Sequence, residues 1–334
     1  GKPAYTDRPI VHEYLHMLNE ETFGTDETIM TVGEMSATNI ENCILYTAPE
    51  RHELSMAFNF HHLKVDYENG KKWTLKNFDF EELKRLFHTW GKEMSDHNGW
   101  SALFWNNHDQ PHALNRFVDV KNFRNEGATM LAASIHLSRG TPYIYMGEEI
   151  GMIDPGYDSM EDYADVESFN AYKMLLNEGK QVEEAFKIIQ AKSRDNSRTP
   201  MQWDSSANAG FTSGTPWLKV GKFYPEINVE KEIQGPIFTF YQKLIALRKK
   251  LPLIAEGSYK PAYEDSQQVY AFERQLGDEK LLVLNNFYSD PITVDVLPEY
   301  QNGEMLLSNY GDSQVEAVMT LRPYESLAIL MKKH

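Results

Sequence analysis

The run ALFWNNHDQPHALNRF, residues 102–117, carries the clearest indication of architecture in this chain. Four apolar residues, ALFW, come first, and the polar residues NNHD follow at once. A short apolar run of this kind predicts a buried strand, so the polar side chains lie at its carboxyl end. In a parallel α/β sheet or barrel, ligands bind at that end of the strands. The alternative is the start of a helix that Asn107 or Asp109 caps.

A second segment of the same form lies upstream, at residues 28–36, TIMTVGEMS. Its apolar, β-rich run closes on Gly33 and Glu34, so this predicted strand also ends on an ionisable residue. Glu34 and Asp109 would then lie at the same ends of two parallel strands and could face one space. Hydrolysis of a glycosidic bond requires carboxylates placed in this way.

Helical and extended patterns alternate over the first three quarters of the chain. Alternation of this kind predicts a parallel sheet with right-handed crossovers, that is, an α/β fold. The four predicted strands are too few to close a (β/α)8 barrel. Helices are predicted at 9–23, 39–46, 79–94, 126–139 and 237–251, and strands at 28–36, 54–63, 102–105 and 141–146.

The pattern changes to a period of two residues after the last of these helices. Short apolar runs separated by turn residues predict a small antiparallel β-sandwich over residues 252–334. Residues 1–251 are assigned to the other domain, with a long polar insert at about 152–232. Loops of that length are usually functional or contain small elements of their own.

Composition excludes several classes of partner. Hydrophobic residues make up 41% of the 334 residues, charged residues 25%, and the net charge is −16. The negative charge argues against nucleic acid, whose phosphates need a basic face, and against anionic membranes. No apolar run approaches the length of a membrane span.

Cys43 is the single cysteine, so no disulfide can form within the chain. This usage favours a reducing compartment, and the first residues lack the apolar core of a secretory signal. We therefore expect a cytoplasmic protein in which Cys43 is a small buried hydrophobic residue.

Four motifs resemble those of the α-amylase superfamily, glycoside hydrolase family 13, and occur in that family's order. They are VGEM at 32–35, NNHDQP at 106–111, GTPYIYMGEEIGM at 140–152 and SRDNSRTPMQW at 193–203. The likeness is greatest to the α-glucosidase branch. It implies that residues 1–251 form the second half of a (β/α)8 TIM barrel, from the fourth helix onward.

The resemblance implies a role for five residues. Glu34 corresponds to the family's proton donor, because a glycosidic oxygen must be protonated as it leaves. Asp109 and His108 correspond to the pair that binds sugar hydroxyls and stabilises the transition state. Arg198 corresponds to an arginine that closes the first sugar subsite and pairs with an aspartate from the missing half. Asn107 is included with the substrate-binding residues as a support for them.

The sequence departs from the family in two places. The family's nucleophile is an aspartate in a GFRxD-like motif on the fourth strand, and no such motif occurs here. His112 stands where the family usually has an arginine. A retaining mechanism needs the nucleophile, so we expect the chain on its own to be inactive.

Residues 58–75, FNFHHLKVDYENGKKWTL, resemble the members of the branch that hydrolyse trehalose 6-phosphate. Lys64, Lys71 and Lys72 are conspicuous in so acidic a chain, and a phosphate group needs several cationic donors. The predicted function is therefore a retaining α-glucosidase acting on this phosphorylated disaccharide. The alternatives are a glucosidase for neutral substrates with α-1,6 links, for which these lysines are only solvated, and a non-catalytic member of the superfamily.

The resemblance implies no organic cofactor, and no metal-binding motif is present in the sequence. The calcium loop of some relatives would belong to the missing half. That half is also the expected partner of the open barrel edges, with self-association through those edges as the alternative.

Overall fold

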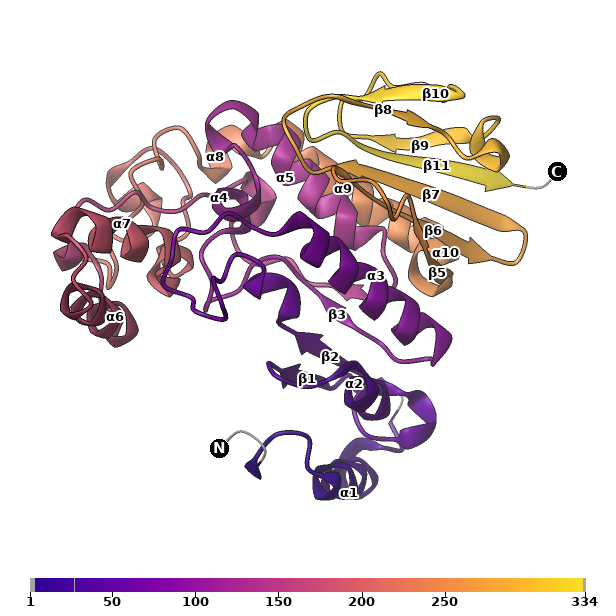
Figure 1. Cartoon of the computed structure of the whole chain (residues 1–334), viewed down its shortest axis with the longest axis horizontal. Helices are drawn as coiled ribbons and strands as arrows, with labels where there is room; N and C mark the ends of the chain where they lie inside the picture. Colours follow the sequence, from indigo (N-terminus) through magenta and orange to yellow (C-terminus); the bar gives the residue numbers. More distant parts are fainter. Residues whose placement is uncertain (1–3, 27, 333–334) are drawn as a thin grey trace.

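The computed structural model describes residues 4–26 and 28–332. Four short parallel strands run through the middle of the molecule, with helices on one side of them (Figure 1). An antiparallel sheet forms the C-terminal part, and a group of helices and loops projects from the opposite end (Figure 1).

The parallel strands are β1 (Val32–Met35), β2 (Met56–Asn59), β3 (Ala102–Leu103) and β4 (Thr141–Pro142). β1 pairs with β2 and β3 pairs with β4, both in parallel. A parallel bridge between Ala57 and Ser101 joins the two pairs, so the spatial order is β1-β2-β3-β4. These strands form the open second half of a (β/α)8 barrel, which confirms the predicted fold class.

Helices connect the strands on the outer face. They are α1 (Pro9–Leu18), α2 (Ile40–Thr47), α3 (Phe80–Asp96), α4 (Ala113–Phe117), α5 (Val120–His136), α9 (Pro236–Lys250) and α10 (Pro252–Glu256). The helix predicted at 79–94 is present as α3, and the Asp79 side chain caps it by accepting a hydrogen bond from the Glu82 amide. α5 is buried from Gly127 to its end, since it lies between the strands and the C-terminal sheet.

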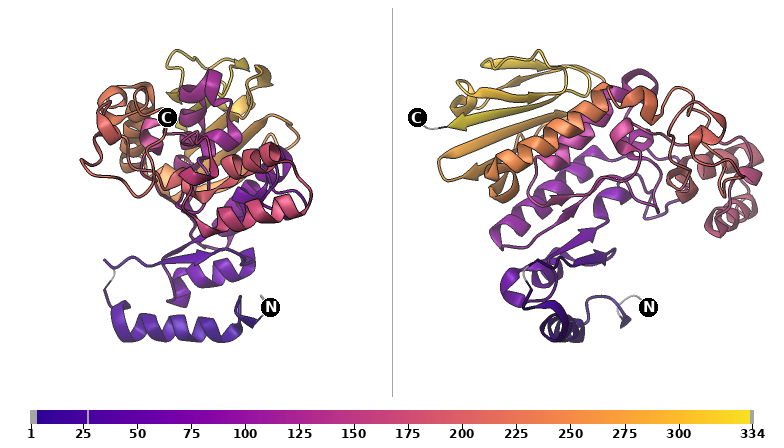
Figure 2. Two further views of the ribbon diagram at one scale, coloured as in Figure 1. Left: turned by 90° about the vertical axis from the view of Figure 1, so that its left-hand side faces the viewer. Right: turned by 180° about the vertical axis from the view of Figure 1, so that it is seen from behind.

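The insert between β4 and α9 contains α6 (Val166–Asn177), α7 (Val182–Lys192) and α8 (Val229–Glu232). α6 and α7 pack against each other around a small core of their own, which includes Tyr163, Leu175 and Ile188. Figure 2 shows that this group projects away from the C-terminal sheet. The insert thus forms a separate wall beside the carboxyl ends of the strands.

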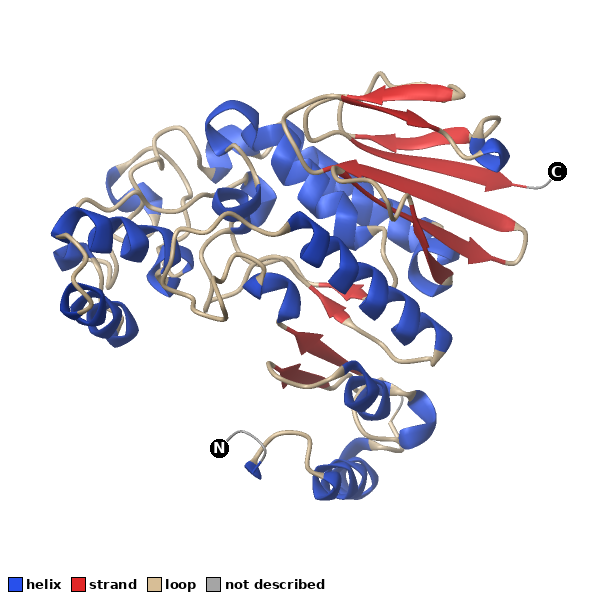
Figure 3. Cartoon of the chain, in the orientation of Figure 1, coloured by secondary structure: helices blue, strands red, loops and turns tan. Residues whose placement is uncertain are grey.

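The C-terminal part is antiparallel throughout (Figure 3). Its larger sheet has the order β5-β6-β7-β11-β9, and β8 pairs with β10 in a second, two-stranded sheet. Alternate residues of the larger sheet face either the barrel helices or the second sheet, as expected for strands of period two. The strands are β5 (Ser258–Ala262), β6 (Val269–Leu276), β7 (Glu279–Asn286), β8 (Ile292–Asp295), β9 (Glu304–Ser308), β10 (Val318–Leu321) and β11 (Ser326–Lys332).

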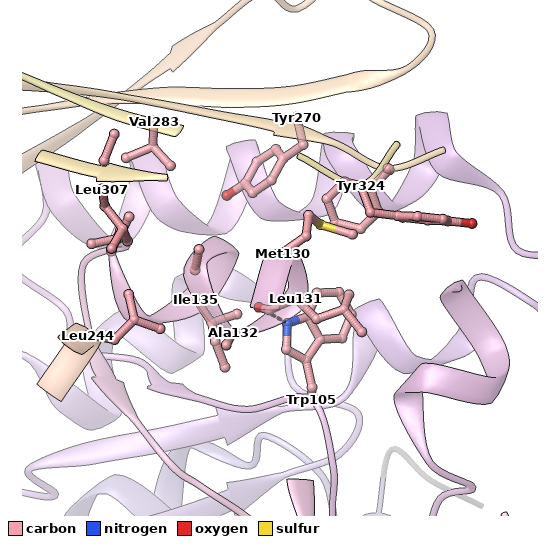
Figure 4. Packing of buried hydrophobic residues seen from close by; sticks show 14 of the residues in the cluster. Trp105, Met130, Leu131, Ala132, Ile135, Leu244, Tyr270, Val283, Leu307 and Tyr324 are labelled. Atoms are coloured by element: carbon pink, nitrogen blue, oxygen red, sulfur yellow. Dashed lines mark hydrogen bonds between the residues drawn. The ribbon is translucent and has the colours of Figure 1, made fainter. Parts of the chain in front are cut away.

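One hydrophobic core joins the two parts of the chain. Trp105, just after β3, packs beneath α5 and donates a hydrogen bond of 2.7 Å from its indole nitrogen to the Leu131 carbonyl (Figure 4). Tyr270 and Val283, from the C-terminal sheet, cover the other side of α5 (Figure 4). The strand that leads into the NNHD run is therefore fixed from behind by residues more than 100 positions away.

Arg274 on β6 forms a second connection. Its guanidinium is fully buried and donates to the carbonyls of Leu137 at 2.7 Å, Ile254 at 2.9 Å and Gly257 at 2.6 Å. Within residues 4–26 and 28–332 no carboxylate forms an ion pair with it, and burial lowers its pKa to about 9. The carbonyl oxygens at the ends of α5 and α10 thus bind a cation from the C-terminal sheet.

The two outer parallel strands lack a neighbour among the described residues. Apolar side chains are exposed at both edges, Met30 and Val32 beside β1 and Ile144 and Met146 after β4. Residues 29–31, predicted as part of the first strand, lie outside β1.

In the part of the chain that the structure describes, none of the helices combines the length and hydropathy that a bilayer crossing would require.

Candidate active site

Glu34 lies in β1, opposite Phe58 of β2, and faces a cavity of about 200 Å³. Asn107 and His108 line the same cavity from the end of β3. Five aromatic rings complete its wall, and they come from β2 and from the segments after β2, β3 and β4. They belong to Phe58, Phe60, Phe104, Tyr143 and Tyr145.

Asp109 lies beside this cavity and is held by two arginines. Arg198 donates from Nη2 to Asp109 Oδ1 at 2.8 Å and from Nε to the His108 carbonyl at 2.6 Å. Arg194 Nη1 approaches the same carboxylate oxygen at 3.4 Å. His108 Nε2 is 3.4 Å from the other oxygen of Asp109. Residues 193–203 of the insert therefore fold onto the end of β3, as expected if the two motifs form one site.

Asparagines shape the turn that carries His108 and Asp109. The Asn107 side chain accepts a hydrogen bond of 2.9 Å from the Asp109 amide. Asn106 accepts from the Ala113 amide at 2.8 Å and donates to Glu148 Oε2 at 2.5 Å. The turn is thus tied both to the start of α4 and to the segment after β4.

Glu148 is the buried support of this turn, and it was not among the predicted site residues. Its other oxygen accepts a hydrogen bond of 3.2 Å from the Tyr241 hydroxyl of α9. Burial raises the pKa of Glu148 to about 8, although the bonds from Asn106 and Tyr241 oppose the shift. Its position in the GEE motif could have indicated it from the sequence, because a glutamate that follows an apolar strand is expected at the carboxyl end of that strand.

His112, the departure from the family pattern, is buried and bonds to Asp154. The Asp154 Oδ1 atom lies 2.9 Å from the His112 amide and 3.1 Å from its Nδ1. The pair joins the start of α4 to the loop after β4. His112 thus fixes the backbone behind the site and does not line the cavity at Glu34.

The structure separates Lys64 from Lys71 and Lys72. Lys64 Nζ donates to the carbonyl of Ser36 at 3.0 Å, two residues beyond Glu34. Lys72 Nζ pairs with Glu167 of α6 at 3.1 Å and lies 4.7 Å from the centre of the Trp73 ring. The exposed Lys71 lines a different cleft, of about 710 Å³, against α6 and α7. This cleft, which Lys72 also lines, shares no residue with the cavity at Glu34.

A buried ion cluster fixes the loop from which Lys64 projects. Asp66 accepts from Arg116 Nη2 at 2.8 Å and from Lys192 Nζ at 2.7 Å. Burial alone would raise the pKa of Asp66, but the two cations lower it overall. Arg116 also donates to the Leu63 carbonyl. The backbone on both sides of Lys64 is therefore anchored to α4 and α7.

Among the described residues, no group of three or more histidine, cysteine, aspartate or glutamate side chains is arranged to hold a metal ion. The ionisable side chains described at this site are carboxylates, an imidazole and two guanidinium groups.

Comparison with known families agrees with this arrangement. The family model described as "Alpha amylase, catalytic domain" matches residues 1–257, and "Alpha-amylase SusG C-terminal domain" matches residues 269–327. The chain belongs to the α-amylase family, as its motifs predicted.

Within the family, the chain is similar to enzymes of two kinds. Trehalose-6-phosphate hydrolase of Bacillus subtilis is 46% identical over 100% of this chain and 60% of that protein. Oligo-1,6-glucosidase of Parageobacillus thermoglucosidasius is 44% identical over 98% of this chain and 59% of that protein. The crystal structure of Bacillus licheniformis trehalose-6-phosphate hydrolase superposes with a TM-score of 0.95 at 47% identity, and the match covers 99% of this chain and 61% of that one. The chain thus spans about 60% of the length of the relatives it matches.

Proposed function

We propose that the chain is the C-terminal portion of a retaining α-glucosidase that hydrolyses trehalose 6-phosphate to glucose and glucose 6-phosphate. The observation that carries the proposal is the position of Lys64, whose ammonium group lies on the Ser36 carbonyl at the end of the strand that holds Glu34. A neutral substrate gives no reason for a cation at that place. The similarity to trehalose-6-phosphate hydrolases of two Bacillus species supports the same substrate.

Glu34 is the general acid in this proposal. Its proton passes to the glycosidic oxygen as the bond from that oxygen to the anomeric carbon breaks. A carboxylate that this chain does not contain forms the bond to the anomeric carbon. Water then displaces that carboxylate, and Glu34, now ionised, takes the proton from the water.

Asp109 and His108 bind hydroxyl groups of the sugar whose anomeric carbon reacts. Positive charge develops on that sugar ring in the transition state, so a nearby carboxylate becomes more stabilising as the bond breaks. Arg198 fixes both residues at once, because it contacts the carboxylate of one and the carbonyl of the other. We infer that Arg198 also orients the sugar hydroxyls at the closed end of the site.

A glucosidase acting on neutral substrates with α-1,6 links is the second candidate. One observation favours it: Lys72 is already paired with Glu167 and so offers a bound phosphate no unpaired charge. The oligo-1,6-glucosidase from Parageobacillus thermoglucosidasius is also almost as similar in sequence as the phosphate-specific relatives.

A chimera separates the candidates. The portion of the Bacillus subtilis relative that the match leaves uncovered is joined to this chain, and glucose release is measured from trehalose 6-phosphate and from isomaltose. We expect kcat/KM to be higher for trehalose 6-phosphate. Preference for isomaltose would favour the neutral-substrate glucosidase. A folded chimera that cleaves neither sugar would favour a non-catalytic member of the family.

A further inference from the structure

A row of alternating charges connects Lys72 with Asp109. Lys72 Nζ lies 3.1 Å from Glu167 Oε2, and the same oxygen lies 3.5 Å from Arg194 Nε. Arg194 Nη1 lies 3.4 Å from Asp109 Oδ1. Glu167 therefore shares its carboxylate between a lysine of the 58–75 loop and an arginine that contacts the candidate transition-state stabiliser.

Arg194 does not depend on Glu167 for its position. It donates from Nε to Asp165 Oδ2 at 2.5 Å and from Nη2 to Asp165 Oδ1 at 3.0 Å, which is a bidentate pair. Asp165 is itself fixed, because it caps α6 by accepting from the Glu167 amide. Loss of the Glu167 carboxylate would therefore leave Arg194 held by Asp165 and deprive Lys72 of its paired carboxylate.

The contact between Lys72 and Glu167 is open to exchange. The Glu167 side chain is 37% exposed and the Lys72 side chain 15%, so an anion from solvent can reach the pair. Ion pairs of this exposure contribute little free energy, and a phosphate offers more charge and more acceptor oxygens than a carboxylate. The hydroxyls of a neutral sugar carry no charge with which to replace Glu167.

We propose that Glu167 is a specificity-determining residue that holds Lys72 until a sugar phosphate binds, and then gives up Lys72 and pairs with Arg194 alone. This inference rests on the proposed function. Glu167 acts as an internal competitor for the phosphate position. The affinity of Lys72 for a phosphorylated sugar then depends on how much more strongly Lys72 binds the phosphate than it binds the Glu167 carboxylate.

The test is a comparison of binding on the chain and on the chimera. Inorganic phosphate, glucose 6-phosphate and glucose are titrated calorimetrically into the parent, Glu167→Gln, Lys72→Ala and the double variant. Glu299→Gln is the matched control, because Glu299 pairs with Lys280 at 3.1 Å in the C-terminal part and neither residue lines the cleft that Lys72 lines.

In Glu167→Gln we expect the Kd for inorganic phosphate and the Kd for glucose 6-phosphate each to fall about fivefold. This change corresponds to the free energy of one partly exposed ion pair. The Kd for glucose should not change. Lys72→Ala should abolish this gain, so the double variant should bind phosphate no better than Lys72→Ala alone. The control should bind phosphate as the parent does.

Each other result overturns the inference. If Lys72→Ala weakens phosphate binding but Glu167→Gln does not strengthen it, Glu167 is no competitor, and the proposed function stands. If Lys72→Ala binds phosphate as well as the parent, Lys72 is no phosphate ligand and the inference fails, while the proposed function still rests on Lys64. If no form binds phosphate, the proposed recognition of a phosphorylated sugar fails too. If Glu299→Gln tightens binding equally, the cause is the net charge of −16.

Discussion

Arg198 and Asp109 form an ion pair, with Nη2 of the arginine 2.8 Å from Oδ1 of the aspartate. The family resemblance led us to expect an aspartate outside this chain as the partner of Arg198. Within the described residues its carboxylate partner is Asp109 itself. Arg198 therefore holds the candidate transition-state stabiliser directly, and its removal should act on catalysis as well as on substrate binding.

Arg198→Lys tests this relationship in the chimera. An ammonium group cannot reproduce the two contacts that the planar guanidinium makes to Asp109 and to the His108 carbonyl. We expect kcat/KM for an aryl α-glucoside to fall about 10- to 100-fold, the value of a lost charged hydrogen bond. Arg85→Lys, on an exposed pair with Glu82, serves as the control. Equal rates for Arg198→Lys and the parent would show that the pair has no catalytic role.

Glu34→Gln removes the proposed acid. In the chimera we expect kcat on trehalose 6-phosphate to fall by about 100- to 10,000-fold with KM little changed, because the amide has no proton to donate. Glu41→Gln, an exposed residue of α2, should retain the parent rate. Near-normal turnover by Glu34→Gln on this substrate, whose leaving group is poor, would exclude the acid role.

Lys64→Ala tests recognition of the phosphate near the acid. The free energy of the transition state for trehalose 6-phosphate should rise by about 1.5–3 kcal/mol, as for the loss of a charged hydrogen bond. Hydrolysis of an unphosphorylated aryl α-glucoside should hardly change. Lys121→Ala, at an exposed position of α5, is the control. Losses of equal size on both substrates would support the glucosidase for neutral substrates.

Glu148→Gln should change how stability depends on pH. The folded-state pKa of Glu148, about 8, lies above its ordinary value of 4.5, so its contribution is complete below pH 4.5 and is lost as the pH rises towards 8. Relative to the parent, the glutamine variant should gain up to about 1.4 kcal/mol of unfolding free energy per pH unit within that window. Urea titrations at pH 5, 6.5 and 8 measure the difference. A difference independent of pH would mean that Glu148 is ionised in the folded protein.

Three buried histidines should lower the free energy of unfolding at acid pH. Burial lowers the pKa values of His62, His88 and His136 to about 4 each, from an ordinary value of 6.5. Their contribution is complete above pH 6.5 and is lost as the pH falls towards 4. Together with Glu148, they predict a maximum of stability near pH 6.5.

The open barrel edges predict association of the chain on its own. β1 and β4 have no outer neighbour among the described residues, and exposed apolar side chains lie beside both. We expect sedimentation to show self-association, no hydrolysis of trehalose 6-phosphate, and a monomer once the chimera supplies the missing strands. Val32→Lys, at the edge of β1, should reduce the association. A monomer that hydrolyses the substrate at full rate would show that the nucleophile lies within this chain.

The sequence predicts those elements whose signals are local. The helix predicted at 79–94 is confirmed as α3, because its cap at Asp79 and its buried residues lie within one run of sequence. Strand lengths were overestimated: β2 ends at Asn59, and residues 61–64 form a helical turn instead of continuing the strand. β5 was missed because Pro261 interrupts its pattern, which a central strand would not tolerate but an edge strand does.

The residues of the candidate site also differ in how far the sequence alone indicates them. Glu34, His108, Asp109 and Arg198 could be proposed from the sequence because each lies in a short motif. Glu148 also lies in a motif, GEE, but its contact with Asn106, more than 40 residues away, could not be predicted. The partner of Glu167 is Lys72, more than 90 residues away. Contacts over such separations are set by how the helices pack, and periodicity does not record them.

The carbonyls that bind Arg274 join three segments: Leu137 after α5, Ile254 in α10 and Gly257 before β5. A truncation after Leu251 would expose the buried side of α5 and leave the Leu137 carbonyl without the cation it binds. Recombination at the end of α9 could therefore not replace the C-terminal sheet with an unrelated one. A transplanted sheet would need α10 and an arginine at position 274, so the two parts are constrained to evolve as one inherited unit.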